Sequence, residues 1–98
     1  DATLVLVVGS VNSSNANRLV EVACVAGAEA YLLDDASQLK ASWLEGHEII
    51  GLTAGASSPD TLVDGVADRL AELGYADREE VELTREDVYF RLPKELRN

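Results

Sequence analysis

Residues 4–8, LVLVV, and the residues 9–14 that follow them, GSVNSS, decide how this chain is expected to fold. Residues 4–8 are all aliphatic, which is typical of a strand buried on both faces in a parallel sheet. The mostly small and polar residues after them predict a loop, and a helix is expected from about Asn15. A strand, a loop and a helix in this order indicate the first half of a βαβ crossover.

The helix expected from about Asn15 ends before Gly27. A glycine after a helix often adopts the left-handed conformation that residues with a Cβ avoid. Apolar residues at spacings of three and four predict which side of this helix is buried. That predicted stripe consists of Leu19, Val22, Ala23 and Ala26.

Two further strands are predicted downstream, at residues 30–33 (AYLL) and 48–52 (EIIGL). Between them, residues 37–44 predict a short helix or turn. Trp43 lies in this connection and is expected to pack it onto the edge of the sheet.

The second long helix has the clearest start in the chain. Ser58 is a good N-cap, Pro59 suits the first helical position and Asp60 suits the positive end of the helix dipole. Gly74 is expected to follow the last turn. The predicted buried stripe consists of Leu62, Val66, Leu70 and Leu73.

Residues 79–84 and 88–92 alternate between polar and apolar side chains, and they predict a strand pair turned at residues 85–87. The alternation of strands and helices before them predicts an α/β class. We expect a Rossmann-like three-layer domain with a mainly parallel sheet and helices on both faces. The 98 residues are expected to form a single domain, residues 1–98.

Composition narrows the classes of partner. The net charge is −10, which disfavours nucleic acid and anionic membrane surfaces, because both bind clusters of Lys and Arg. A single cysteine excludes a disulfide framework within the chain. No signal peptide or membrane-spanning run is found, so a cytoplasmic location is expected. The chain opens without a methionine, and we expect it to be a piece of a longer protein.

Two stretches carry no charge at all, although 27% of the chain is charged. One lies between Asp1 and Arg18, and the other lies between Glu48 and Asp60. Each contains a predicted strand and the loop that follows it. The polar or flexible residues are Ser10, Asn12, Ser13, Ser14, Asn15 and Asn17 in the first stretch, and Thr53, Gly55, Ser57 and Ser58 in the second.

These loops are candidates for anion binding. A helix start presents free backbone N–H groups and partial positive charge, and hydroxyls and amides add neutral donors. Two such loops side by side could hold a diphosphate. Ser and Asn are equally ordinary helix caps and turn residues, and the loops by themselves leave both interpretations open. Neither loop contains GxxxxGK[ST] or GxGxxG, which makes a dinucleotide site unexpected.

Four segments of the chain resemble one known family. They are VLVVGSVNSSNANRL (5–19), YLLDDA (31–36), LTAGASSPD (52–60) and LPKELR (92–97), in this order. Together they make the chain similar to the C-terminal part of the 4-hydroxy-3-methylbut-2-enyl diphosphate reductase (IspH/LytB) family. The resemblance spans nearly the whole chain.

The resemblance implies that the chain is the third domain of a three-domain iron–sulfur reductase. That enzyme catalyses the last step of the non-mevalonate isoprenoid route and yields isopentenyl and dimethylallyl diphosphate. A 4Fe–4S cluster is the implied cofactor, and a ferredoxin- or flavodoxin-type protein is the implied electron donor. The other implied partners are the diphosphate substrate and the enzyme's own upstream domains.

By match to the family's motifs, the substrate-binding residues are Ser13, Ser14, Asn15 and Ser57. No catalytic residue and no metal ligand falls in this chain, because the family's cysteines, histidines and catalytic glutamate precede Asp1. The chain alone is therefore expected to hold no cluster and to be inactive. Two departures are Ala16, where the family usually has Ser, and Val11, where it commonly has Lys.

Other chemically suggestive residues are interpreted as structural. Cys24 is expected to be a small buried residue of the first helix, and His47 a surface residue in a turn. Asp34 and Asp35 end the second strand and are interpreted as a turn or cap. The alternative to the reductase is a stand-alone acidic α/β module whose loops bind another small anion or serve only the fold.

Overall fold

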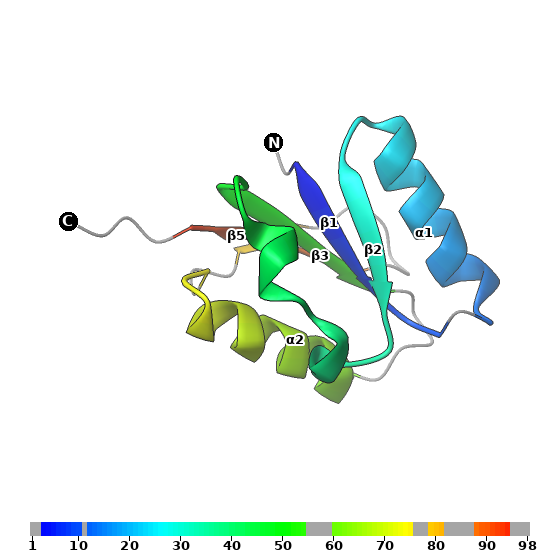
Figure 1. The fold of residues 1–98 in the computed structure, drawn as a ribbon. Helices are drawn as coiled ribbons and strands as arrows, with labels where there is room; N and C mark the ends of the chain where they lie inside the picture. Colours follow the sequence, from blue (N-terminus) through cyan, green and yellow to red (C-terminus); the bar gives the residue numbers. More distant parts are fainter. Residues whose placement is uncertain (1–2, 11, 55–59, 76–78, 82–87, 95–98) are drawn as a thin grey trace.

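The strands and helices of the chain form a five-stranded sheet with helices on its two faces (Figure 1). The structure, a computed structural model, describes residues 3–10, 12–54, 60–75, 79–81 and 88–94. The elements in chain order are β1 (Leu4–Val8), α1 (Ser14–Val25), β2 (Glu29–Leu33), the 3₁₀ helices η1 (Ala36–Gln38) and η2 (Ala41–Leu44), β3 (Ile49–Ala54), α2 (Asp60–Glu72), β4 (Glu79–Val81) and β5 (Val88–Pro93).

The sheet is mainly parallel, as the sequence predicts. Its strand order is β2-β1-β3-β5-β4. β1 pairs in parallel with both β2 and β3, whereas β5 is antiparallel to β3 and β4. Four of the five described strands therefore run in one direction and β5 runs in the other. The α/β class is confirmed.

β1 divides the core between the two faces, because successive side chains of a strand point to opposite sides. Leu4, Leu6 and Val8 join the larger cluster, which contains the buried side chains of α2. Val5 and Val7 join a smaller cluster with α1. All five are buried, so the uninterrupted LVLVV run is explained by a strand covered on both faces.

The buried stripe of α1 differs from the predicted one. Ala16 and Ala23 are buried, and Leu19 and Val20 pack beside them against the sheet. Val22 is 57% exposed and Val25 is 89% exposed. Three predictions are wrong as a result: Val22 and Ala26 lie outside the stripe, and Cys24 is exposed rather than buried. The helix carries apolar residues on more than one side, so periodicity could not choose which side meets the sheet.

The predicted stripe of α2 is confirmed. Val66 and Leu70 are fully buried, and Leu62 and Leu73 pack against the same cluster. Val63 and Ala67 widen the stripe. Gly27 and Gly74 follow the two helices with φ of +93° and +103°, as predicted for left-handed residues. The predicted cap Ser58 and Pro59 lie outside the described residues.

The connection after β2 contains two short 3₁₀ helices. Trp43 on η2 stacks on Tyr31 of β2, with ring centroids 4.1 Å apart and planes 2° apart. Because β2 is an edge strand, the predicted packing of Trp43 at the sheet edge is confirmed. β4 and β5 form the predicted antiparallel pair, and the turn at residues 85–87 lies outside the described residues.

His47 is not the surface residue expected from the sequence. Its side chain is 14% exposed, and its Nδ1 lies 2.6 Å from the hydroxyl of Thr3, which precedes β1. Its Nε2 lies 3.5 Å from a carboxylate oxygen of Glu29 on β2. Tyr75, which follows α2, donates its hydroxyl to the His47 carbonyl at 2.6 Å. Burial raises the pKa of the Tyr75 hydroxyl.

None of the described helices is both long and apolar enough to cross a lipid bilayer.

Candidate functional site

The candidate site lies where β1 and β3 end. These neighbouring parallel strands are in register from Leu4↔Ile50 to Val8↔Ala54, so they end side by side. The chain therefore leaves β1 and β3 at adjacent positions at one end of the sheet. Ligands of open α/β sheets bind at this end, beyond the carboxyl ends of the strands.

The first loop is organised by Ser10. Its carbonyl accepts a hydrogen bond from the Ser13 backbone N–H at 2.9 Å. Its side-chain oxygen accepts from the Asn12 N–H at 3.1 Å. These two bonds turn the chain sharply after β1 and bring Ser13 to the start of α1.

Ser13 is the N-cap of α1. Its backbone is extended, with φ −83° and ψ 117°, and its hydroxyl oxygen accepts from the Ala16 N–H at 3.2 Å. A serine hydroxyl has one proton and two lone pairs, so accepting this bond leaves the proton for an acceptor outside the helix. Capping and ligand binding are therefore compatible at Ser13, although the sequence presents them as alternatives.

Asn17, one helical turn further along α1, binds the Ser13 carbonyl. Its side-chain Nδ2 donates to the Ser13 carbonyl at 2.9 Å, and its backbone N–H donates to that carbonyl at 3.1 Å. The sequence places Asn17 in the polar stretch without giving it a role. The spacing of four from an N-cap residue is the signal that could have found it, because that spacing brings the two residues together on a helix.

Ser14 and Asn15 are exposed residues in the first turn of α1. The first N–H groups of a helix have no partner within it, and they carry the partial positive charge of the dipole. No acidic residue lies in this turn to offset that charge. The predicted group Ser13, Ser14 and Asn15 is therefore continuous in the fold and can offer hydroxyl, amide and backbone donors to an anion.

The second polar stretch follows Leu52 in the sequence. Ser57, the fourth predicted site residue, lies outside the described residues. Thr53, which the sequence places in this polar loop, belongs to β3 and is 5% exposed. The strand runs to Ala54 rather than to Leu52, because its last residues pair with β1 on one side and with β5 on the other.

The residues of this chain do not fit an iron–sulfur cluster. Such clusters are bound by several thiolates, and the chain has one cysteine. Cys24 lies on the exposed side of α1, about 15 Å along the helix axis from Ser14 at ~1.5 Å per residue. In the described part of the chain, no three His, Cys, Asp or Glu side chains come together as metal ligands.

Asp35 is a cap, as predicted. Its carboxylate accepts from the Ser37 hydroxyl and, at 2.8 Å, from the Ser37 backbone N–H. These two bonds, the hydroxyl bond foremost, hold the pKa of Asp35 below its usual range. Asp35 thus caps η1.

Comparison with known proteins identifies the family. A family model described as "LytB protein" matches residues 1–71, which is more than half of the chain. The chain therefore belongs to the LytB protein family, and the resemblance found in the sequence is confirmed.

Named relatives agree. The chain is 58% identical over 94 residues to a 4-hydroxy-3-methylbut-2-enyl diphosphate reductase of Xanthomonas axonopodis pv. citri (strain 306). It is 56% identical over 94 residues to that of Alcanivorax borkumensis and 53% identical over 96 residues to that of Edwardsiella ictaluri. The matches cover 96% to 98% of this chain and 30% of each relative. The chain thus spans less than a third of the length of these relatives.

One solved structure is similar to the fold. It is titled "Structure of (E)-4-Hydroxy-3-methyl-but-2-enyl Diphosphate Reductase, the Terminal Enzyme of the Non-Mevalonate Pathway". The TM-score is 0.68 at 30% sequence identity, over 72% of this chain and 25% of the other.

Proposed function

We propose that this chain is the C-terminal domain of a three-domain 4-hydroxy-3-methylbut-2-enyl diphosphate reductase and that it binds the diphosphate group of the substrate. The proposal is supported by the reductase relatives, which match the chain over 30% of their own length. The observation that carries it is the start of α1. There Ser13, Ser14 and Asn15 present donors at a helix end without an acidic residue.

All four residues would donate hydrogen bonds to the diphosphate. Ser13 would donate its hydroxyl proton while its oxygen continues to cap α1. Ser14 and Asn15 would donate from the first turn of α1, and Ser57 would donate from the segment that follows β3 in the sequence. Fixing the diphosphate would orient the rest of the substrate toward the reacting centre, which is the proximity contribution to catalysis.

The reduction itself would depend on residues outside this chain. The full reaction replaces the allylic hydroxyl by hydrogen, consumes two electrons and two protons and releases water. A 4Fe–4S cluster would supply the electron chemistry, and a ferredoxin- or flavodoxin-type protein would donate the electrons. We place the protein in the cytoplasm and expect this chain alone to be inactive.

Steady-state kinetics of the full-length enzyme test the proposal. Ser13→Ala, Ser14→Ala, Asn15→Ala and Ser57→Ala should each weaken substrate binding. A hydrogen bond to a charged group is worth about 1.5–3 kcal/mol, so KM should rise by about tenfold or more. Ser42→Ala is the matched control, because Ser42 is an exposed serine on η2, before β3 begins.

Competition by inorganic diphosphate separates this function from its alternative. Diphosphate should inhibit the parent enzyme, and the four variants should weaken that inhibition while Ser42→Ala leaves it unchanged. An unchanged KM and an unchanged diphosphate inhibition in all four variants would show that these loops serve only the fold. Preference for another small anion over diphosphate would favour the stand-alone module.

A further inference from the structure

The edge strand β2 exposes backbone hydrogen-bonding groups. Two bonds fix its orientation: the Glu29 N–H donates to the Thr3 carbonyl at 2.9 Å, and the Gly9 N–H donates to the Leu33 carbonyl at 2.8 Å. In a parallel pair, alternate residues direct both N–H and C=O toward the neighbouring strand. The register with β1 therefore turns Glu29, Tyr31 and Leu33 toward β1.

The intervening residues, Ala30 and Leu32, direct their N–H and C=O groups away from β1. β2 is the last strand on this side of the described sheet. One position further along, the Asp34 N–H points the same way and donates to the Gln38 side-chain Oε1 at 2.6 Å. Gln38 thus occupies the end of the edge, and the edge before it stays open in the described part of the chain.

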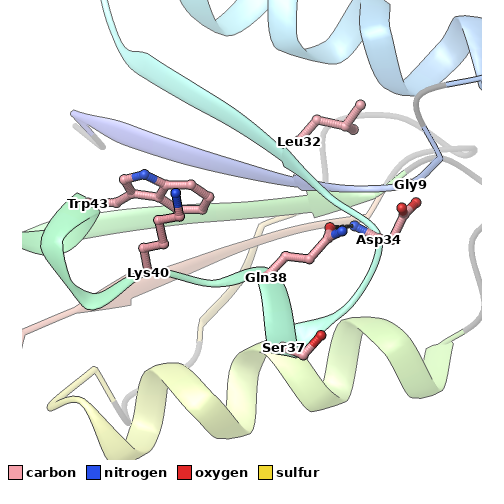
Figure 2. A pocket seen from close by; sticks show the side chains of 7 residues that line it. All are labelled: Gly9, Leu32, Asp34, Ser37, Gln38, Lys40 and Trp43. Atoms are coloured by element: carbon pink, nitrogen blue, oxygen red, sulfur yellow. Dashed lines mark hydrogen bonds between the residues drawn. The ribbon is translucent and has the colours of Figure 1, made fainter.

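A cavity of about 410 Å³ lies beside this open edge (Figure 2). Leu32 projects on one side of β2, whereas Gln38, Lys40 and Trp43 lie on the other. The Trp43 ring is held by its stack on Tyr31, and the Lys40 ammonium lies 5.8 Å from its centre. A rigid aromatic wall and an apolar side chain therefore flank the exposed backbone groups.

These features match the geometry of strand addition. An extended peptide that pairs with an edge strand gains backbone hydrogen bonds, and its alternate side chains enter pockets on the two faces. Here one row of side chains would contact Leu32 and the other would contact Trp43. Proteins commonly protect such edges with covering elements, and only the Asp34 end of β2 is closed in the described residues.

Charge indicates the kind of peptide that fits. Three acidic residues flank β2 in the chain: Glu29 is its first residue, and Asp34 and Asp35 follow its last. Asp34 and Lys40 are the charged residues that line the cavity. The chain as a whole carries a net charge of −10. Electrostatic attraction therefore favours a basic partner.

We propose that the open edge of β2 is a docking site for an extended, basic segment of a partner protein, which adds to the sheet as a further strand. This proposal does not depend on the proposed function, because β2 contributes none of the diphosphate-binding residues.

Hydrogen exchange of the full-length protein tests the pairing. The probe is an acetylated and amidated heptapeptide of alternating lysine and valine, KVKVKVK. Without it, the Ala30 and Leu32 amides should exchange rapidly while those of Tyr31 and Leu33 are protected. The peptide should slow the exchange of Ala30 and Leu32. Protection of both amides before any peptide is added would show that the edge is already occupied and would overturn the proposal.

Two altered peptides separate pairing from simple charge attraction. Methylation of two adjacent central amide nitrogens blocks both edges of the probe strand and keeps its charge, and it should abolish binding. The acidic peptide EVEVEVE should bind at least tenfold more weakly than KVKVKVK. Equal binding of the methylated or the acidic peptide would contradict strand addition by a basic segment.

A matched pair of charge variants localises the site. Lys40→Glu removes the basic residue at the cavity and should tighten KVKVKVK binding by about fivefold, since a charge near a surface contributes on the order of 1 kcal/mol. Lys94→Glu makes the same change in net charge beyond the end of β5, which pairs with β3 rather than with β2. An equal effect of the two variants would indicate nonspecific attraction and would overturn the proposal.

Discussion

The two ends of the parallel strands differ in how their polar side chains are used. At the amino end of the parallel strands, polar side chains bond to one another or to carbonyls. His47 contacts Thr3 and Glu29, and Tyr75 reaches the His47 carbonyl. At the carboxyl end, Ser14 and Asn15 are exposed in a helix turn that has no acidic residue. The amino end uses its polar side chains for stability, whereas the carboxyl end combines such structural bonds with exposed residues at the start of a helix.

The difference follows from strand direction. In a parallel sheet, the loops that follow the strands all lie at the carboxyl end of the strands. The starts of the next helices, with their free N–H groups, lie at this end too. The ends of helices and the residues that precede strands lie at the amino end. Substitutions at the amino end should therefore change stability alone, whereas substitutions at the start of α1 should change anion binding, with an added change in stability where the residue also supports the helix.

The largest effect is expected from Tyr75→Phe at the amino end. The variant removes the hydroxyl that donates to the His47 carbonyl at 2.6 Å and to the Leu44 carbonyl at 3.2 Å. The Leu44 carbonyl keeps the His47 N–H as a partner at 3.1 Å, so the loss falls mainly on the half-buried His47 carbonyl. Leaving such a carbonyl without this partner costs about 1–3 kcal/mol in unfolding free energy. Chemical denaturation measures the loss, and diphosphate inhibition should stay unchanged. Tyr31→Phe, which keeps the stack on Trp43, is the control; equal destabilisation by both would contradict the role of the Tyr75 hydroxyl.

Ser13→Ala should affect both properties, because this residue caps α1 and also belongs to the candidate site. Loss of an N-cap costs typically ~1 kcal/mol of stability. Ser13→Thr keeps a hydroxyl and should recover most of the stability and most of the diphosphate binding. The comparison is made by denaturation and inhibition assays on the same preparations. If Ser13→Thr recovered stability but not diphosphate binding, a hydroxyl at this position would be enough for capping and not enough for binding.

Ser14→Asp sharpens the contrast between the two ends, because its two effects have opposite signs. A carboxylate in the first turn of α1 stabilises the helix dipole by about 0.3–1 kcal/mol at low salt. The same charge repels diphosphate. We expect a slightly higher unfolding midpoint together with weaker inhibition by diphosphate. If inhibition were unchanged, the first turn of α1 would not be the anion site.

The smallest effect concerns Asp35, beyond the end of β2. Ser37→Ala removes the hydroxyl bond and should raise the pKa of this carboxyl toward its usual range. Because the folded state lowers this pKa, the contribution of Asp35 to stability is present above the ordinary carboxyl pKa and is lost as pH falls through the lowered value. In Ser37→Ala, the contribution of Asp35 to stability should be lost at a higher pH than in the unchanged protein. An NMR titration of the Asp35 carboxyl measures the shift, and Ser42→Ala should leave it unmoved.

Local patterns predicted most of the elements. β1 has the predicted bounds, and Gly27 and Gly74 follow their helices as left-handed residues. The α2 stripe is confirmed because its large apolar residues lie mainly on one side. The α1 stripe was wrong because Leu19, Val20, Val22 and Val25 lie on several sides, and only contact with β1 and β2 selects among them.

The sequence also predicted only part of the candidate site. Family motifs in the sequence pick out Ser13, Ser14 and Asn15. The roles of Ser10 and Asn17 were not predicted, because they act through a hydrogen-bonded turn. His47 was mistaken for a surface residue, because its partners Thr3 and Glu29 are distant in sequence and meet it only through strand pairing.

The sequence by itself determined the α/β class, the strand–helix order and the family, because these depend on residue type and on spacing along the chain. The tertiary structure decided which side of α1 is buried, what His47 contacts and which edge of β2 has no neighbouring strand among the described residues. Each of these depends on neighbours brought together across the sheet, and no local pattern of residues records such neighbours.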